Sequence, residues 1–350
     1  MRAARRIMRA GVARGFLIVL VALGAAGAIH AASRADAFRI EFLRGDKRVW
    51  VMNGDGSDQH VATPNGYAWW SPDGRRIALS VAGRDHPRLY IANKYGTKRR
   101  KVADTYPGGD CWEPQWDPSG DKMTFDAGCE IDVTDLFVVR RDGTRRRRLA
   151  RRLWTLTPRW SPDGREILFA GSPSPHNNYG LYLTTPGGRP AKRISGVAFE
   201  FQYNIDWRWS PDGRSIFLLA ETQDGSNRGF ELSALPSDGG ELHQLTPAEL
   251  NVYAFDVSPD GQRIVLQGST GMRDWEIYVI NADGTDLEQL TDNRSQDRRP
   301  LWSPDGRSIL FTSERDGNYE IYVMGADGTG ETNLSQNPAD DYYASWIPAQ

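Results

Sequence analysis

The chain has 350 residues with a formal net charge of −2, and it contains 36 Gly, 20 Pro and 12 Trp. This length allows one large all-β domain or two average ones. The charge shows no basic excess of the kind that nucleic-acid binding requires, so we expect no nucleic-acid partner. Many turn residues together with many large aromatic residues indicate short strands that pack through aromatic side chains.

Residues 1–31 have the features of a secretory signal. Five Arg and no acidic residue lie in the first 14 positions, and an apolar run of 14 residues follows at 16–29. A membrane span needs about 20 apolar residues, whereas a short apolar run between a basic start and small residues is typical of a cleaved signal. We expect export to the periplasm, the cell surface or the medium, with 32–350 as a single domain of charge −7. An uncleaved anchor is the alternative, and it would be the only membrane contact.

Two short motifs recur along the rest of the chain. WSPDG occurs at 70–74, 160–164, 209–213 and 302–306, with the variants WDPSG at 116–120, VSPDG at 257–261 and a C-terminal SWIP at 345–348. An alternating strand followed by a Gly turn, such as IYVINADG at 277–284, also occurs seven times, and successive prolines of the first motif are 44 to 49 residues apart.

Each repeat predicts four antiparallel strands. One strand precedes the Trp, Ser-Pro-Asp-Gly forms a tight turn, and β-rich segments such as 307–313 and 320–324 follow. The Asp-Gly turn then returns the chain along a fourth strand. Four strands in about 45 residues is the period of a propeller blade. Because a lone sheet cannot bury both faces, we predict a seven-bladed β-propeller in which each Trp packs between neighbouring blades.

The chain ends predict how the ring closes. Residues 342–348 align with the first strand of a blade, whereas residues 38–63 begin at a second strand. We therefore expect 342–347 to pair with 38–43 in a shared blade, which removes both free sheet edges.

The repeat at 302–335 resembles the WD40-like repeat of TolB-type propellers, and the resemblance extends over 38–348. The resemblance implies the propeller fold but indicates little about the function. TolB itself is usually counted as six-bladed, so a six-bladed ring is the alternative. TolB itself carries a separate N-terminal domain, which we do not expect here.

Motifs for known chemistry are absent from the sequence. It contains no G-x-S-x-G, no P-loop and no H-E-x-x-H. We therefore expect no cofactor and no metal site.

Polar residues at the start of the inner strands are the candidate binding residues. The position five residues before each Trp holds Asn65, Cys111, Thr155, Asn204, Val252, Asp297 and Asp341. We expect these residues to ring the mouth of the central channel, on the face that carries the longer loops, and Asn65, Thr155, Asn204, Asp297 and Asp341 to contact a ligand there.

The function that these features favour is a binding or scaffold module, expected to be monomeric, whose partner is a protein or an envelope polymer. The alternative is a glycan lyase or hydrolase in the central funnel, with Asp297 and Asp341 as the paired carboxylates. A run at 140–152 contains eight Arg, which predicts either a basic docking patch or a solvated outer strand.

The only two cysteines, Cys111 and Cys129, are expected to form a disulfide. The turn at 118–121 places them nearly opposite each other in a regular hairpin, where facing Cα atoms are about 4.5 to 5.5 Å apart. The bond closes a short loop and is expected to stabilise the fold by about 3 kcal/mol. Mass spectrometry without reductant checks this prediction, which fails if both thiols are alkylated.

Overall fold

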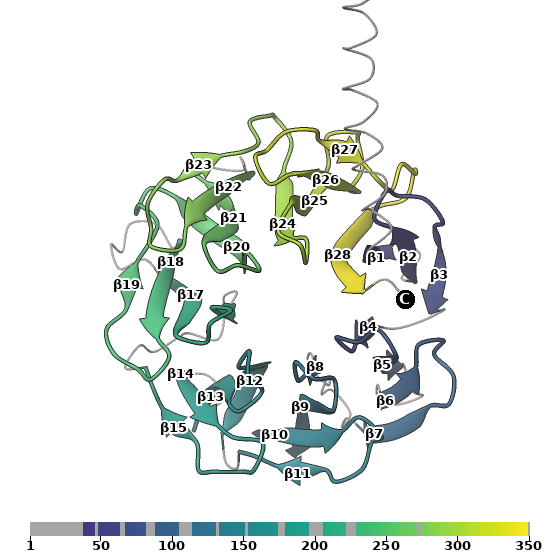
Figure 1. Cartoon of the computed structure of the whole chain (residues 1–350), viewed down its shortest axis with the longest axis vertical. Helices are drawn as coiled ribbons and strands as arrows, with labels where there is room; N and C mark the ends of the chain where they lie inside the picture. The colour runs from purple at the N-terminus through teal and green to yellow at the C-terminus, as the bar shows by residue number, and fades with distance from the viewer. Residues whose placement is uncertain are drawn as a thin grey trace, which may run out of the picture.

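Seven four-stranded antiparallel sheets are arranged around a central axis in the computed structural model (Figure 1). The structure describes residues 38–45, 48–63, 67–81, 88–104, 114–130, 133–150, 153–173, 179–195, 206–221, 229–271 and 275–348. The chain is thus a seven-bladed propeller, as predicted, and not a six-bladed one. No helix long and apolar enough to cross a membrane occurs within these ranges.

We number the blades in chain order and give the strands of each from the innermost to the outermost. Blade 1 contains β28 (Asp341–Pro348), β1 (Phe38–Arg44), β2 (Val49–Asn53) and β3 (His60–Thr63). Blade 2 contains β4 (Tyr67–Trp70), β5 (Arg76–Val81), β6 (Arg88–Asn93) and β7 (Arg100–Asp104). Blade 3 contains β8 (Gln115–Trp116), β9 (Lys122–Glu130), β10 (Val133–Arg140) and β11 (Arg147–Arg148). Blade 4 contains β12 (Trp154–Trp160), β13 (Ile167–Ser172), β14 (Gly180–Thr184) and β15 (Lys192–Arg193).

The last three blades follow the same order. Blade 5 contains β16 (Trp207–Trp209), β17 (Ser215–Glu221), β18 (Phe230–Pro236) and β19 (His243–Gln244). Blade 6 contains β20 (Asn251–Val257), β21 (Arg263–Ser269), β22 (Glu276–Asn281) and β23 (Glu288–Gln289). Blade 7 contains β24 (Asp297–Trp302), β25 (Ser308–Ser313), β26 (Glu320–Gly325) and β27 (Thr332–Asn333).

Blade 1 closes the ring as predicted. β28 pairs antiparallel with β1, from Phe38 opposite Pro348 to Arg44 opposite Asp341. Figure 1 shows the yellow C-terminal strand beside the purple N-terminal strands. One strand from the C-terminus therefore completes a sheet of three strands from the N-terminus.

The Ser-Pro-Asp-Gly turn is held by the same hydrogen bonds in successive blades. In blade 5 the Ser210 hydroxyl donates to Asp212 Oδ1 over 2.6 Å, and the backbone N–H of Arg214 donates to the same oxygen over 3.0 Å. The turn ends at Gly213, whose φ of 72° disfavours a side chain. The Ser210 hydroxyl, followed by the Arg214 N–H, lowers the pKa of Asp212. These turns and the Asp-Gly turns lie together on one face of the ring, which we call the turn face.

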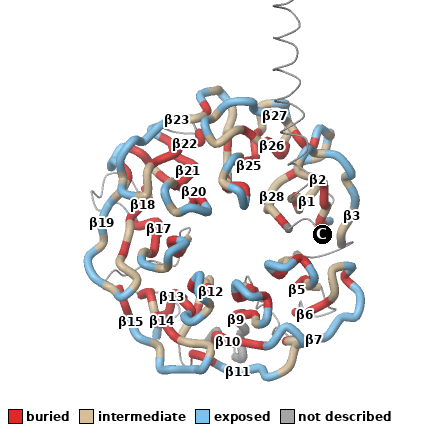
Figure 2. Tube along the Cα trace, viewed as in Figure 1, coloured by how far each residue is buried: buried red, intermediate tan, exposed pale blue. Residues whose placement is uncertain are grey.

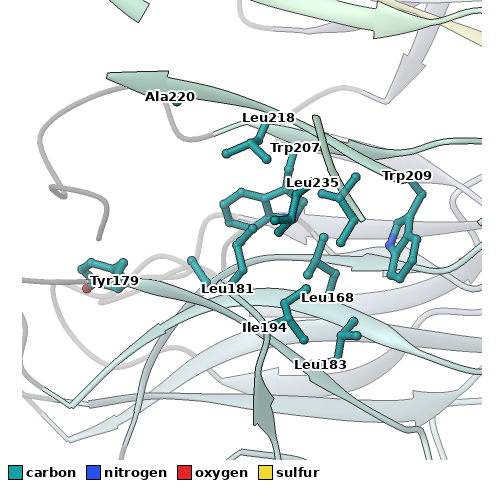
Figure 3. Packing of buried hydrophobic residues seen from close by; sticks show 12 residues of the cluster. Leu168, Tyr179, Leu181, Leu183, Ile194, Trp207, Trp209, Leu218, Ala220 and Leu235 are labelled. Carbon is teal, nitrogen blue, oxygen red and sulfur yellow. The ribbon is translucent and has the colours of Figure 1, made fainter. Parts of the chain in front are cut away.

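The core lies in the seams between blades. Figure 3 shows the seam between blades 4 and 5, where Trp207 and Trp209 of β16 meet Leu168 and Leu181 of the preceding blade. The repeated Trp also carries a polar contact, because the Trp116 indole donates to the backbone oxygen of Trp69 in blade 2 over 2.9 Å. The predicted packing of these Trp residues between blades is confirmed. Figure 2 shows the same division, with buried sheet interiors and an exposed outer rim.

The Gly of the Asp-Gly turn packs against the blade before it. A Cβ atom at Gly56 would lie 2.6 Å from the backbone oxygen of Leu334 in blade 7, and its φ is 85°. Both the turn conformation and the close approach therefore require Gly at this position, which explains why this residue recurs while the neighbouring acids do not.

Candidate functional site at the inner edge of the ring

The predicted channel residues that the structure describes are buried. Thr155, Asp297 and Asp341 stand at the start of their inner strands, and each is 0% exposed. Asn65 and Asn204 lie outside the described residues. A ligand-binding role for all five stays a prediction. The described side chains form hydrogen bonds with other residues of the chain.

Asp341 accepts a two-pronged ion pair from Arg44. The Arg44 Nε lies 2.8 Å from Asp341 Oδ1, and one terminal guanidinium nitrogen lies 2.8 Å from Oδ2. The Arg44 guanidinium carbon also lies 4.2 Å from the centre of the Trp50 ring. Asn337 Nδ2 donates a further hydrogen bond to Asp341 Oδ2 over 3.0 Å. Burial raises the pKa of Asp341, against the opposing effect of Arg44. This pair joins the C-terminal strand to the N-terminal strand inside blade 1.

Asp297 in blade 7 is also paired with an Arg side chain, but through one carboxylate oxygen only. Its Oδ2 accepts from Arg315 over 2.8 Å and from Asn293 Nδ2 over 2.8 Å. Its Oδ1 is buried without a hydrogen-bond partner. In blade 4, the Thr155 hydroxyl donates to Asp126 Oδ1 over 2.7 Å. Buried hydrogen bonds therefore connect the start of each of these inner strands to neighbouring strands or loops.

A β-bulge lies one or two residues after the predicted ring position in four inner strands. The register shifts in β12, β20, β24 and β28 each insert one extra residue opposite the second strand. Arg299 and Tyr343 adopt φ values of 52° and 57° at these bulges, a left-handed conformation that is costly for residues with a side chain. Bulges of this kind reorient a side chain and are frequent beside functional sites.

The bulge residues place Tyr and Arg side chains in solvent at the inner edge of three adjacent blades. Tyr253 in β20 is 44% exposed, Tyr343 in β28 is 53% exposed, and Arg299 in β24 is exposed. The Arg299 guanidinium lies 4.3 Å from the centre of the Tyr343 ring, across the boundary between blades 7 and 1. Arg298 lies 5.3 Å from the Tyr319 ring. We call Tyr253, Arg298, Arg299, Tyr319 and Tyr343 the mouth patch.

Sequence reasoning missed the mouth patch because it identified the strand starts instead. A bulge shifts the side-chain alternation by one residue, and no Gly marks it in these four strands. The available signal was a pair of large polar or aromatic residues directly after the predicted ring position, as in Arg298-Arg299 and Tyr342-Tyr343.

An ion-pair chain lines the inner strands of blades 4 to 6. Arg208 contacts Asp206 and lies 3.8 Å from Asp256, while Arg159 lies 3.8 Å from Asp206. Burial raises the pKa of Asp256 to about 6, although Arg208 opposes this shift. Because two Arg and two Asp alternate here, the charges of these four side chains cancel.

The disulfide and the metal site are the remaining features considered from the sequence. The β8–β9 hairpin has the predicted register, with Gln115 opposite Thr124, but Cys111 and the Cys129 side chain lie outside the described residues. The disulfide stays a prediction. Within the described part of the chain, no group of three or more His, Cys, Asp or Glu side chains could hold a metal ion.

Comparisons with known proteins agree with this architecture. The chain matches the family described as the TolB beta propeller domain over residues 44–253 and 248–350. It is 30% identical over 163 residues to an uncharacterized protein of Agrobacterium fabrum, an alignment that covers 46% of this chain and 51% of the relative. This chain therefore aligns with about half the length of that relative.

Solved structures share the fold at low sequence identity. TolB from Acinetobacter baumannii superposes with a TM-score of 0.56 at 17% identity, over 86% of this chain and 79% of that one. An oligogalacturonate lyase in complex with manganese superposes with a TM-score of 0.60 at 14% identity, over 79% and 82% of the two chains. These likenesses show the fold alone. With the family match covering most of its length, the chain belongs to the TolB β-propeller domain family.

Proposed function

We propose that this chain is an exported binding module that holds an extended segment of a partner protein at the mouth patch. One observation carries the proposal. Tyr253, Arg299 and Tyr343 are exposed on the inner strands of three consecutive blades, and the backbone is strained at Arg299 and Tyr343. Tyr and Arg are enriched among residues that contribute most to protein interfaces, and residues in strained backbone conformations cluster at functional sites.

The chemistry of the mouth patch suits a peptide that carries carboxylates and apolar side chains. Guanidinium groups that stack on aromatic rings stay oriented and still present donors for a carboxylate. Export is inferred from residues 1–31, and a protein of the cell envelope is the partner that this location favours.

The glycan lyase or hydrolase alternative has less support. It relies on Asp297 and Asp341 as catalytic carboxylates, and both are 0% exposed and paired with Arg side chains. A general acid or base must reach its substrate within hydrogen-bond distance.

Replacement of two mouth-patch residues tests the proposed function. The double variant Arg299→Ala/Tyr343→Ala is expected to capture its envelope partner at least thirtyfold more weakly, because truncation of interface Tyr or Arg residues costs about 2 kcal/mol or more. The measurement is quantitative pull-down from the native envelope, followed by titration of the identified partner.

The matched control is Tyr95→Ala, which removes a Tyr that is 72% exposed on the outer part of blade 2. It should leave capture unchanged. Equal capture by the double variant and the native chain, with both folded, would exclude the mouth patch as the binding site.

A further inference from the structure

Charge is segregated around the outer rim of the propeller. We define the rim segment of a blade as its Gly turn and its outermost strand. The rim segments of blades 2, 3 and 4, at 93–104, 140–150 and 184–195, contain fourteen Lys and Arg and only two Asp. The corresponding segments of the other four blades, at 53–63, 236–246, 281–291 and 325–335, contain nine Asp and Glu and no Lys or Arg. We call the first set the basic arc and the second the acidic arc.

The basic arc is continuous from blade to blade. Its cations are exposed at all positions except Lys94. Arg100 of blade 2 extends across the turn of blade 3, where its Cδ lies 2.9 Å from the site of a Cβ atom at Gly143. Arg147 of blade 3 donates to the backbone oxygen of Gly187 in blade 4 over 2.5 Å. Guanidinium groups therefore bridge both blade boundaries of the arc.

The fourteen cations of the arc outnumber its two Asp, so the three segments together carry a large positive charge. Two of these cations form ion pairs with carboxylates of neighbouring segments, Arg141 with Asp121 at 3.3 Å and Arg148 with Asp135 at 3.1 Å. Arg146 instead stacks on the Phe137 ring at 4.7 Å, which fixes its position. The arc thus combines a high positive charge with side chains held in place.

Protection of the outer edge strands explains the presence of charge but not its segregation. Charged side chains on an edge strand prevent pairing with another sheet, and either sign serves this purpose. The acidic arc protects its four edge strands with carboxylates, so edge protection alone does not explain why blades 2 to 4 carry fourteen cations. A surface with segregated positive charge is suited to attract an anionic partner.

The curvature of the arc and the charge around it determine which anionic partner fits. A flat bilayer can touch a convex rim only at its middle blade. Docking on the turn face would bring the acidic arc, along with turn residues such as Asp212 and Asp260, against the same anionic surface. A flexible linear chain can instead follow all three blades.

We propose that the basic arc binds a linear acidic polysaccharide along the outer strands β7, β11 and β15. Ten of the fourteen cations are Arg, whose planar guanidinium matches a carboxylate with two parallel hydrogen bonds. The choice of polysaccharide rests on the export predicted from residues 1–31, which places envelope polymers within reach. It does not depend on the mouth patch, which lies on the inner strands.

Binding of polygalacturonate, a linear chain with one carboxylate per sugar, tests the proposal. The native protein is expected to bind it with an affinity that falls as salt is added, and to ignore fully methyl-esterified polygalacturonate, which keeps the backbone but lacks the charge. The triple variant Lys98→Gln/Arg145→Gln/Arg189→Gln removes one exposed cation from each blade. It should bind about tenfold more weakly, as expected for the loss of three exposed ion pairs.

A matched control uses the acidic arc. Asp58 and Asp286 occupy the same turn position as Lys98 and Arg145, and all four have φ between 52° and 55°. The variant Asp58→Asn/Asp286→Asn therefore changes charge at the same turn position and should leave polygalacturonate affinity unchanged or slightly higher. An equal loss of affinity in both variants would contradict the proposal.

Oligomer length provides a second readout. Affinity should rise with oligogalacturonate length until the chain spans three blades and then level off, because each added contact is intramolecular. The proposal would be overturned by tighter binding to anionic lipid vesicles or to DNA than to polygalacturonate. It would also be overturned by an affinity that does not depend on oligomer length. The double variant Arg299→Ala/Tyr343→Ala should bind the polymer normally, which separates this test from that of the proposed function.

Discussion

A chain that ends at Asp340 is expected to lose its cooperative unfolding transition and to aggregate at 25 °C. The deletion removes β28, exposes the edge of β1, and leaves Arg44 without its carboxylate. An open sheet edge promotes association between chains, and a buried charge that loses its partner costs about 3 to 5 kcal/mol, a large part of the total stability of a domain. Circular dichroism during urea titration and size-exclusion chromatography measure the effect.

Two controls make this prediction specific. A chain that ends at Pro348 keeps all of β28 and should unfold like the native protein. A peptide with the sequence of residues 341–350, added in trans, should restore the transition to the longer deletion by occupying the vacant strand position. A cooperative, monomeric chain that ends at Asp340 would contradict the closure mechanism.

The ion pair alone can be tested against its repeat in blade 7. Arg44→Ala and Arg315→Ala each remove the partner of a fully buried Asp, but only Arg44 joins the two ends of the chain. Arg44→Ala should destabilise the protein by about 3 to 5 kcal/mol and speed its unfolding more than Arg315→Ala does.

Glu41→Leu is expected to stabilise the protein by roughly 2 kcal/mol at pH 8. Glu41 is itself only partly buried, at a position of the second strand that the other six blades fill with Ala78, Thr124, Leu168, Phe217, Val265 and Leu310, each at most 3% exposed. Its Oε2 is buried without a hydrogen-bond partner. Burial raises the pKa of Glu41 from 4.5 to about 8, and the Trp70 side chain of blade 2 offsets only part of this shift.

The direction of the pH dependence follows from this raised pKa. Between pH 4.5 and about 8 the folded protein binds a proton at Glu41 that the unfolded chain releases, so this residue makes stability fall as pH rises through that window. Urea midpoints from pH 5 to 8.5 should show the fall in the native protein and a flatter profile in Glu41→Leu and Glu41→Gln. Glu288→Gln, at an exposed position of the outer strand β23, is the surface control. A profile that Glu41→Gln does not change would show that Glu41 is charged in the folded state throughout.

The fold was predictable because its determinants are local and repeated. Each Ser-Pro-Asp-Gly turn is fixed by hydrogen bonds among neighbours such as Ser210, Asp212 and Arg214, and the Trp before it marks the seam. Closure was predictable because residues 342–348 align with the first strand of a blade, whereas residues 38–63 supply the other three strands.

The candidate site was less predictable because it depends on the local register and on contacts between blades. Asp297 and Asp341 were placed correctly at the start of their strands, but nothing in the sequence near them announces Arg315 or Arg44 as a partner. The exposure of Tyr343 depends on a bulge, and the contact of Arg299 with it crosses a blade boundary. The segregated rim charge was visible in part as the Arg run, but its extent requires the blade order.

The pairing of β1 with β28 also sets how the ring responds to mechanical force. Phe38 and Pro348 lie opposite each other at one end of the pair, and Arg44 and Asp341 lie opposite each other at the other end. A pull on the two termini therefore loads one residue pair at a time and unzips the strands, instead of shearing all their hydrogen bonds together. The buried Arg44–Asp341 pair is reached last and acts as the final latch, so the ring should open at low force in two steps.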